Sequence, residues 1–195
     1  MNKSGYSFVL SLVFLVMLSA GPAQVYAAES YTLDPAHSFV EFKIPHLGYS
    51  VLVGRFNEVE GGFTYDEANP SASNIDVTVN TVSIDSNHAK RDKHLKSEDF
   101  LEVGKYPKAT FKSTSISQNG DDIQIKGMLE MHGVKKEVTI DAEFVGAGPD
   151  PWGGYRRGYK GTMTLGLKDF GINYDLGPAS TEVTLGLFIE GIRDK

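Results

Sequence analysis

The sequence contains no cysteine, so the chain can form neither a disulfide nor a cysteine-linked lipid anchor. At 195 residues it is long enough to bury a hydrophobic core without covalent cross-links. The absence of cysteine therefore has little consequence for stability, even in an oxidising compartment.

Positive charge is scarce and scattered. There are 19 Lys and Arg residues against 25 Asp and Glu residues, a formal net charge of −6. No basic run appears, and basic residues do not interleave with aromatic ones. Nucleic acids and anionic membrane surfaces are bound through clustered Lys and Arg side chains. We therefore expect neither as a partner.

A long hydrophobic run is found only near the N-terminus. Lys3 supplies a positive start, Phe8 to Leu18 is apolar except for Ser11, and small residues accompany Tyr26 up to Ala27. This pattern is typical of a cleavable secretory signal peptide, and the run is too short to span about 30 Å of hydrocarbon. We predict cleavage after Ala27 and export of one domain, residues 28–195, to the periplasm without stable membrane insertion.

Enzyme signatures are also missing. No serine lies in a G-x-S-x-G turn, and the Gly153-Gly154 pair lacks the lysine pattern of a phosphate-binding loop. Paired carboxylates such as Asp121-Asp122 lie in a predicted hairpin turn. We therefore expect no catalytic residues.

One alternative is a metal-dependent or redox enzyme built on His88, Asp92 and His94. On a helix, His88 and Asp92 share a face one turn apart, whereas His94 falls on a different face. The three ligands would not converge, so we expect no metal. His37 and His46 are isolated and are interpreted as turn or rim residues.

What the sequence does have is alternation of apolar and polar residues, as in Ile75, Val77 and Val79 against Asp76 and Thr78. A period of two indicates a strand with one dry face and one wet face. Many such strands at short spacing are typical of an antiparallel sandwich or a closed barrel. The predicted strands are 31–34, 39–45, 51–56, 59–66, 74–85, 110–117, 122–131, 136–146, 155–167 and 181–192.

Turn chemistry separates these segments. The predicted turns are Gly61-Gly62, Asn69-Pro70, Asn119-Gly120 and His132-Gly133. One stretch, 86–104, is charged and favours helix. Ser86 or Asn87 can cap its start, and Ser97, followed by acidic residues, resembles a second helix start. We expect two short helices across one end of a barrel.

The apolar faces would line the interior of such a barrel. An interior formed by about eight strands accommodates side chains or one elongated ligand. Inner glycines reduce side-chain volume and favour a bound ligand over collapse; the candidates are Gly61, Gly127, Gly161 and Gly186. The predicted lining residues are Val40, Phe42, Ile44, Phe63, Tyr65, Val77, Val79, Phe111, Leu129, Phe144, Met163, Leu165, Leu185 and Leu187. A small outer-membrane barrel, with polar residues inside and apolar residues facing lipid, stays as an alternative. Against it, the aromatic residues are scattered and do not form two girdles at the strand ends.

Short motifs follow one another in a characteristic order. They include Phe39-Val-Glu-Phe, His46-Leu-Gly-Tyr-Ser, Gly54-Arg-Phe, Gly62-Phe-Thr-Tyr-Asp, Val82-Ser-Ile-Asp, Arg91-Asp-Lys-His-Leu, Lys105-Tyr-Pro, His132-Gly-Val, Asp150-Pro-Trp-Gly-Gly and Lys168-Asp-Phe. In these motifs the chain resembles the YceI family over essentially all of residues 28–195. Glu137 departs from the pattern, because a proline is expected there after the His132 turn.

The resemblance implies an all-β fold: a lipocalin-like, extended, eight-stranded antiparallel barrel with a short helical insertion near residues 86–104. It also implies a periplasmic protein that binds a polyisoprenoid lipid or a quinone in the interior, with no other cofactor. Transport, storage and stress-response roles stay open, as do the chain length, the head group and the oligomeric state, including a homodimer. Polar residues near the barrel mouth would suit a diphosphate or quinone head group; the candidates are His46, Tyr49, Arg55, Arg91, Asp92 and His94.

Overall fold

The computed structural model describes residues 28–195, so the predicted signal peptide and its cleavage site lie outside the described residues. The strands are β1 (Glu29–Leu33), β2 (Phe39–His46), β3 (Ser50–Phe56), β4 (Val59–Tyr65), β5 (Asn74–Asn80), β6 (Ile84–Asp85), β7 (Lys108–Asn119), β8 (Asp122–Met131), β9 (Val134–Pro149), β10 (Tyr155–Gly166) and β11 (Glu182–Arg193). The helical elements are α1 (Ala89–Leu95) and the 3-10 turns η1 (Pro70–Ala72), η2 (Thr81–Ser83) and η3 (Leu167–Phe170).

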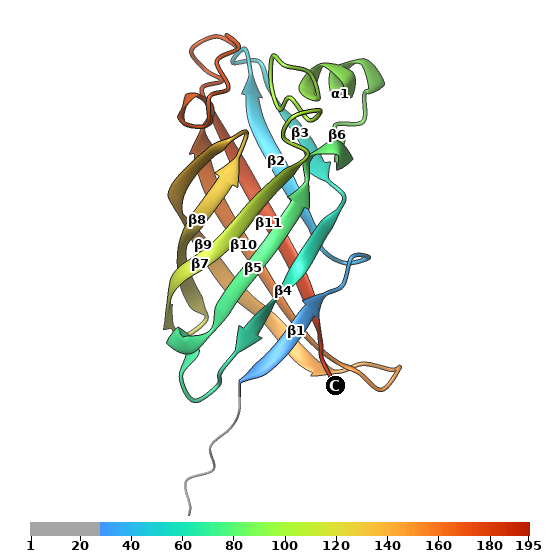
Figure 1. Ribbon diagram of the computed structural model, residues 1–195, viewed down its shortest axis with the longest axis vertical. Helices are drawn as coiled ribbons and strands as arrows, with labels where there is room; N and C mark the ends of the chain where they lie inside the picture. The colour runs from blue at the N-terminus through green and yellow to red at the C-terminus, as the bar shows by residue number, and fades with distance from the viewer. Residues whose placement is uncertain (1–27) are drawn as a thin grey trace, which may run out of the picture.

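These strands form one closed antiparallel barrel (Figure 1). Closure comes from β1, which pairs with β4 on one side and with β11 on the other. Three consecutive pairs of strands, β1 with β2, β3 with β4 and β5 with β6, each act as one interrupted strand of the barrel. β1 and β2 both pair with β11, β4 and β3 pair with β1 and β2, and β5 and β6 pair with β4 and β3. β11, for example, pairs with β2 through 184–188 and with β1 through 191–193. The predicted eight-stranded antiparallel barrel is thus confirmed.

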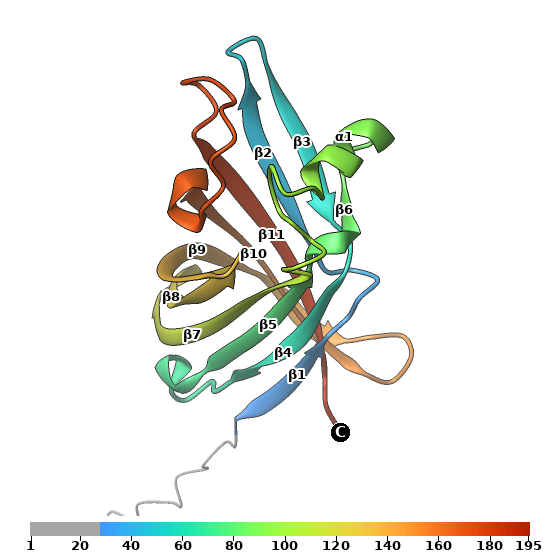
Figure 2. The same cartoon turned by 45° about the horizontal axis from the view of Figure 1, so that its top comes forward.

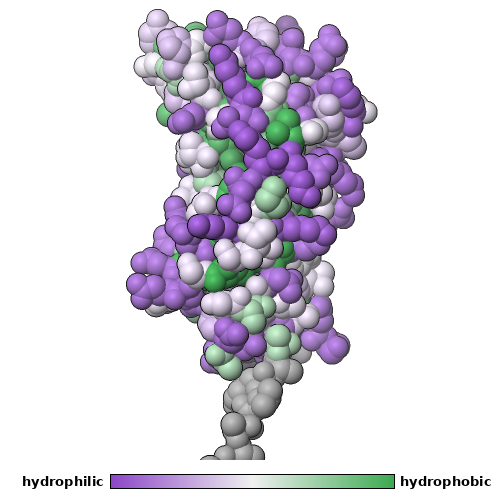
Figure 3. Space-filling view, turned by 60° about the vertical axis from the view of Figure 1, so that its left-hand side comes forward, coloured by the Kyte–Doolittle hydropathy of each residue, from purple (hydrophilic) through white to green (hydrophobic). Residues whose placement is uncertain are grey.

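Alternation places apolar side chains inside the barrel. In β8, Ile123, Ile125 and Leu129 are buried, whereas Gln124 and Lys126 are exposed. Hydrophilic side chains cover most of the flank in Figure 3, and apolar ones show only in gaps between them. This is the reverse of an outer-membrane barrel, which turns its apolar residues outward. Among the helices of residues 28–195, none has the length and apolar character needed to cross a bilayer.

The helical insertion lies at the end of the barrel called here the upper end; the lower end carries the C-terminus (Figure 1). A single helix forms, α1, and its N-cap is His88, whose Nδ1 accepts the Arg91 N–H at 3.3 Å. The predictions of a cap at Ser86 or Asn87 and of a second helix at Ser97 were wrong. The Ser97 hydroxyl instead donates to the His94 carbonyl at 2.7 Å and so continues the end of α1 as a turn. Figure 2 shows α1 beside the rim rather than across it.

The predicted hairpin turns at Asn119-Gly120 and His132-Gly133 are confirmed, with Gly120 and Gly133 at positive φ. Asn69-Pro70 also lies in a connection, between β4 and β5. Gly61-Gly62 was wrong as a turn, because both residues lie inside β4. Gly61 has φ +121°, and a Cβ there would lie 2.2 Å from the carbonyl oxygen of Asp76. The pair therefore permits close backbone approach between strands rather than chain reversal.

We predict that Gly61→Ala lowers the free energy of unfolding by about 1–3 kcal/mol, because the new Cβ meets both strain and backbone atoms. Gly146→Ala is the matched control: it lies in β9, and a Cβ there meets nothing within 4 Å. Urea unfolding followed by circular dichroism measures both. Equal stability of the two variants would contradict the close-approach role of Gly61.

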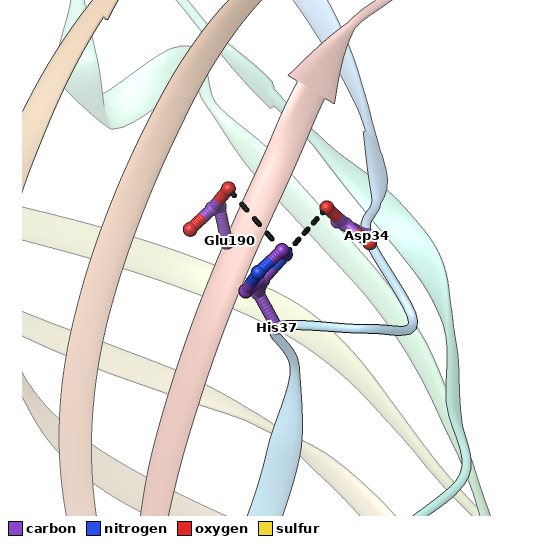
Figure 4. Close-up of side chains that lie close together, drawn as sticks. All are labelled: Asp34, His37 and Glu190. Atoms are coloured by element: carbon purple, nitrogen blue, oxygen red, sulfur yellow. Dashed lines mark hydrogen bonds and ion pairs between the residues drawn. The ribbon is translucent and has the colours of Figure 1, made fainter. Parts of the chain in front are cut away.

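An ion cluster fastens the barrel where β11 changes partner from β2 to β1. Arg156 of β10 binds Asp34 in the β1–β2 connection, Glu190 of β11 and Asp150 in the β9–β10 connection. His37 Nδ1 lies 2.8 Å from Asp34 and 4.0 Å from Glu190 (Figure 4). The cluster thus joins three segments that are distant in sequence at the point where strand pairing is interrupted.

The cluster gives stability a pH dependence. A hydrogen bond with His37, supported by Arg156 and the Ala36 N–H, lowers the pKa of Asp34 from 3.8 to about 2. Because the folded-state pKa is the lower one, the ionised Asp34 stabilises the fold above pH 3.8, and this contribution is lost as the pH falls toward about 2.

We predict that Asp34→Asn lowers the free energy of unfolding at neutral pH by about 1–3 kcal/mol and flattens its decline in acid. The exposed Asp122→Asn is the control and should follow the wild type. Urea unfolding at a series of pH values measures all three proteins. Parallel pH profiles for wild type and Asp34→Asn would count against this role.

Candidate functional site

The barrel encloses a cavity of about 180 Å³ with an almost entirely apolar wall. It extends from Leu101 and Met131 near the upper end to Tyr65 and Ile116 near the lower end. Of the predicted lining residues, those that border it are Val40, Phe63, Tyr65, Val77, Val79, Phe111, Leu129, Met163, Leu185 and Leu187. Because the wall is apolar and water finds few partners in it, the cavity suits a hydrocarbon chain better than solvent.

Four of the predicted lining residues do not border this cavity. Phe42 fills the space above Gly54, where a Cβ would lie 2.4 Å from its ring. Ile44 borders a separate pocket beside the β2–β3 hairpin, and Leu165 is core, 4% exposed. Phe144 packs edge-on against Tyr159, with ring centroids 5.7 Å apart. Alternation identifies the inward face of a strand but does not tell which inward residues face open space.

Several wall residues were not predicted. Leu101 comes from the turn segment after α1, so this segment, and not the helix, contributes to the upper end of the cavity. The other wall residues that were not predicted lie in strands whose apolar–polar alternation was evident in the sequence, and this alternation could have identified them. They are Leu33, Phe56, Ile75, Ile116, Ile123, Ile125, Met131, Ile140, Ala142, Tyr159 and Ile189.

Of the four glycines expected to open the interior, only Gly161 borders the cavity. The space at Gly127 is occupied by the Phe111 ring, 2.3 Å from where a Cβ would stand. Gly186 lies beside Glu41 and Phe188, and Gly61 serves the strand contact described above. The general expectation was therefore wrong for three of these positions, because neighbouring rings or strands take up the volume.

None of the six predicted head-group residues borders the barrel cavity. Arg91 donates from Nε to the Ser86 hydroxyl at 2.7 Å, and Asp92 accepts the Ser86 N–H at 2.8 Å. His94 bonds Asp99 at 2.9 Å and packs against Phe100. These three residues hold the turns around α1.

The other three residues lie on the β2–β3 hairpin, away from the barrel cavity. Tyr49 is 87% exposed at the tip of the β2–β3 hairpin. Arg55 points outward, with its guanidinium carbon 5.6 Å from the centroid of the Phe39 ring. His46 borders only the pocket beside the β2–β3 hairpin. The structure thus gives no geometric support to a head-group site formed by this set.

The alternative metal site is not assembled either. His88 caps α1, Asp92 binds Ser86 and His94 binds Asp99, so the three side chains have separate partners. Within residues 28–195, the group that does bring metal-ligand types together is Asp34, His37 and Glu190. Arg156 already binds both carboxylates of that group, which makes it an ion-pair cluster in this structure.

The polar feature that sequence reasoning missed is Arg157, which points into the lower end of the barrel. Its guanidinium carbon lies 3.7 Å from the ring centroid of Tyr65 and 5.3 Å from that of Phe144. Its Nε and Nη1 groups lie 3.4 Å from the hydroxyls of Tyr31 and Tyr159. Burial raises the pKa of Tyr159, so its phenol stays protonated at neutral pH. One sequence signal could have identified Arg157. It lies two residues from Tyr159 in an alternating strand, so both side chains point to the same, inward face.

Comparison with known proteins gives a consistent family. The model of the YceI-like domain family matches residues 31–190. A UPF0312 protein of Pseudomonas paraeruginosa is 58% identical over 179 residues, which cover 91% of this chain and 92% of the relative.

Two solved structures share the fold. A Campylobacter jejuni YCEI protein superposes with a TM-score of 0.68 at 26% identity, covering 78% of this chain and 91% of that chain. A polyisoprenoid binding domain from Saccharophagus degradans, implicated in plant cell wall breakdown, superposes with a TM-score of 0.62 at 15% identity. This likeness covers 84% of the present chain and 98% of that domain.

Proposed function

Because the chain belongs to the YceI family, we propose that it is a lipid-binding protein that holds a long isoprenoid chain in the barrel cavity. The observation that carries this proposal is the apolar cavity along the barrel, bordered by side chains from strands all around its wall. The polyisoprenoid binding domain with the same fold supports the choice of ligand class.

The physical basis is the removal of hydrocarbon from water. Each buried CH₂ contributes about 0.8 kcal/mol, so a chain of several isoprene units needs few polar contacts for tight binding. Measured affinities saturate well below the sum of such contributions, which leaves polar contacts free to set the orientation of the ligand. The largely apolar wall of this cavity would provide the affinity, and its few polar groups would orient the ligand.

The proposal includes export to the periplasm, supported by the signal-peptide pattern of residues 1–27. There the protein would shield an insoluble lipid during transport, storage or a stress response. Family membership and the separate partners of His88, Asp92 and His94 favour a binding protein over an enzyme.

Lipid recovery tests the proposal. Protein expressed with its own N-terminus should co-purify with an isoprenoid chain, seen as a mass shift in native mass spectrometry and extracted by organic solvent. Ala142→Phe adds a ring to the cavity wall and should reduce recovered lipid about tenfold, equivalent to about 1.4 kcal/mol of binding energy.

Asp141→Phe is the matched control, because the same ring is added one residue away on the exposed face. It should retain wild-type occupancy, with folding of each variant verified by circular dichroism. The proposal would be contradicted by wild-type protein that contains no lipid, or by equal losses from Ala142→Phe and Asp141→Phe.

A further inference from the structure

Most polar side chains beside the cavity already have partners within the protein. The Thr81 hydroxyl donates to the Tyr106 carbonyl at 2.7 Å, and Gln118 Nε2 donates to the Gly120 carbonyl at 3.0 Å. Lys160 pairs with Glu143 on the outer face at 2.9 Å. These groups are therefore not free to bind a ligand without breaking an existing interaction.

Tyr159 differs from them. Its hydroxyl accepts an N–H of Arg157 at 3.4 Å, and its own proton has no acceptor among residues 28–195. Its ring borders the cavity and is held edge-on by Phe63 and Phe144, with centroids 5.6 and 5.7 Å away. Because Arg157 occupies one side of the hydroxyl oxygen, the phenol is oriented with a free donor beside a largely apolar chamber.

We propose that the Tyr159 hydroxyl donates a hydrogen bond to an oxygen atom of the lipid head group. The head group then lies at the lower end of the cavity, and the hydrocarbon tail runs upward toward Leu101 and Met131. Arg157 is a positioning residue, which holds the phenol through its acceptor side. This inference rests on the proposed function and adds to it the direction and the polar contact of the ligand.

The surroundings of Tyr159 favour a neutral, carbonyl-bearing head group such as a quinone ring. Its carbonyl oxygens accept hydrogen bonds, and its planar face packs against aromatic side chains such as Phe63. A diphosphate would bring several negative charges into this aromatic wall. Arg157 is stacked on Tyr65 and directs N–H groups at two tyrosine hydroxyls, so it is poorly placed to balance those charges.

The test compares three probes on lipid-free protein: a farnesylated benzoquinone, farnesyl diphosphate and squalene, which has no oxygen. Tyr159→Phe should weaken binding of the quinone about fivefold to tenfold, the effect of one lost hydrogen bond, and change squalene binding by less than about twofold. Tyr174→Phe, a hydroxyl deletion in the loop before β11, is the control and should leave both affinities unchanged. Wild type should bind the quinone more tightly than the diphosphate.

A spectroscopic measurement makes the test independent of small affinity changes. The infrared carbonyl band of the bound quinone should lie at lower frequency in wild type than in Tyr159→Phe, because a hydrogen bond weakens the C=O bond. An unchanged band and affinity in Tyr159→Phe, or tighter binding of the diphosphate, would overturn this inference while squalene binding still supports the proposed function. Wild-type protein that binds none of the probes would overturn both.

Discussion

The structure depends on the pairing of β1 with both β4 and β11, which closes the sheet. An open sheet would expose unpaired backbone groups along two edges and could not keep its apolar face away from water. Closure is interrupted where the chain leaves β1 for β2, and there Arg156 connects Asp34, Glu190 and Asp150 across the gap. The enclosed cavity depends on this closure of the barrel between β1 and β11.

Closure also divides the side chains of the barrel into two populations. Outward residues form ion pairs with their neighbours across strands, such as Lys112 with Asp76 and Lys160 with Glu143. Inward residues leave a chamber with an almost entirely apolar wall, and Arg157 and the tyrosines lie at its lower end. An apolar chamber with one polar end is suited to an amphipathic chain, since the hydrocarbon supplies affinity and the polar end selects orientation.

The charged residues of the helical insertion were expected to bind a ligand head group, but in the structure they stabilise the turns of the insertion. Arg91 and Asp92 satisfy the backbone and hydroxyl of Ser86, and His94 pairs with Asp99. A turn exposed at a barrel rim leaves backbone groups without strand partners, and nearby polar side chains satisfy them. The insertion therefore reaches the cavity through Leu101, an apolar residue of its non-helical part.

The sequence by itself determined most of the strands, the inward face of each, the turns at Asn119-Gly120 and His132-Gly133, and ten residues of the cavity wall, because alternation and turn chemistry are local properties. The predicted strand 74–85 is broken at 81–83 by η2. Tertiary structure decided which inward positions face open space: Phe111 fills the room left by Gly127, and Phe42 covers Gly54. It also decided that Arg157 of β10 meets Tyr31 of β1 and Tyr65 of β4, which are distant from it in the sequence. These contacts depend on the register of strands that pair across long stretches of sequence, and a one-residue change in register would exchange the two faces.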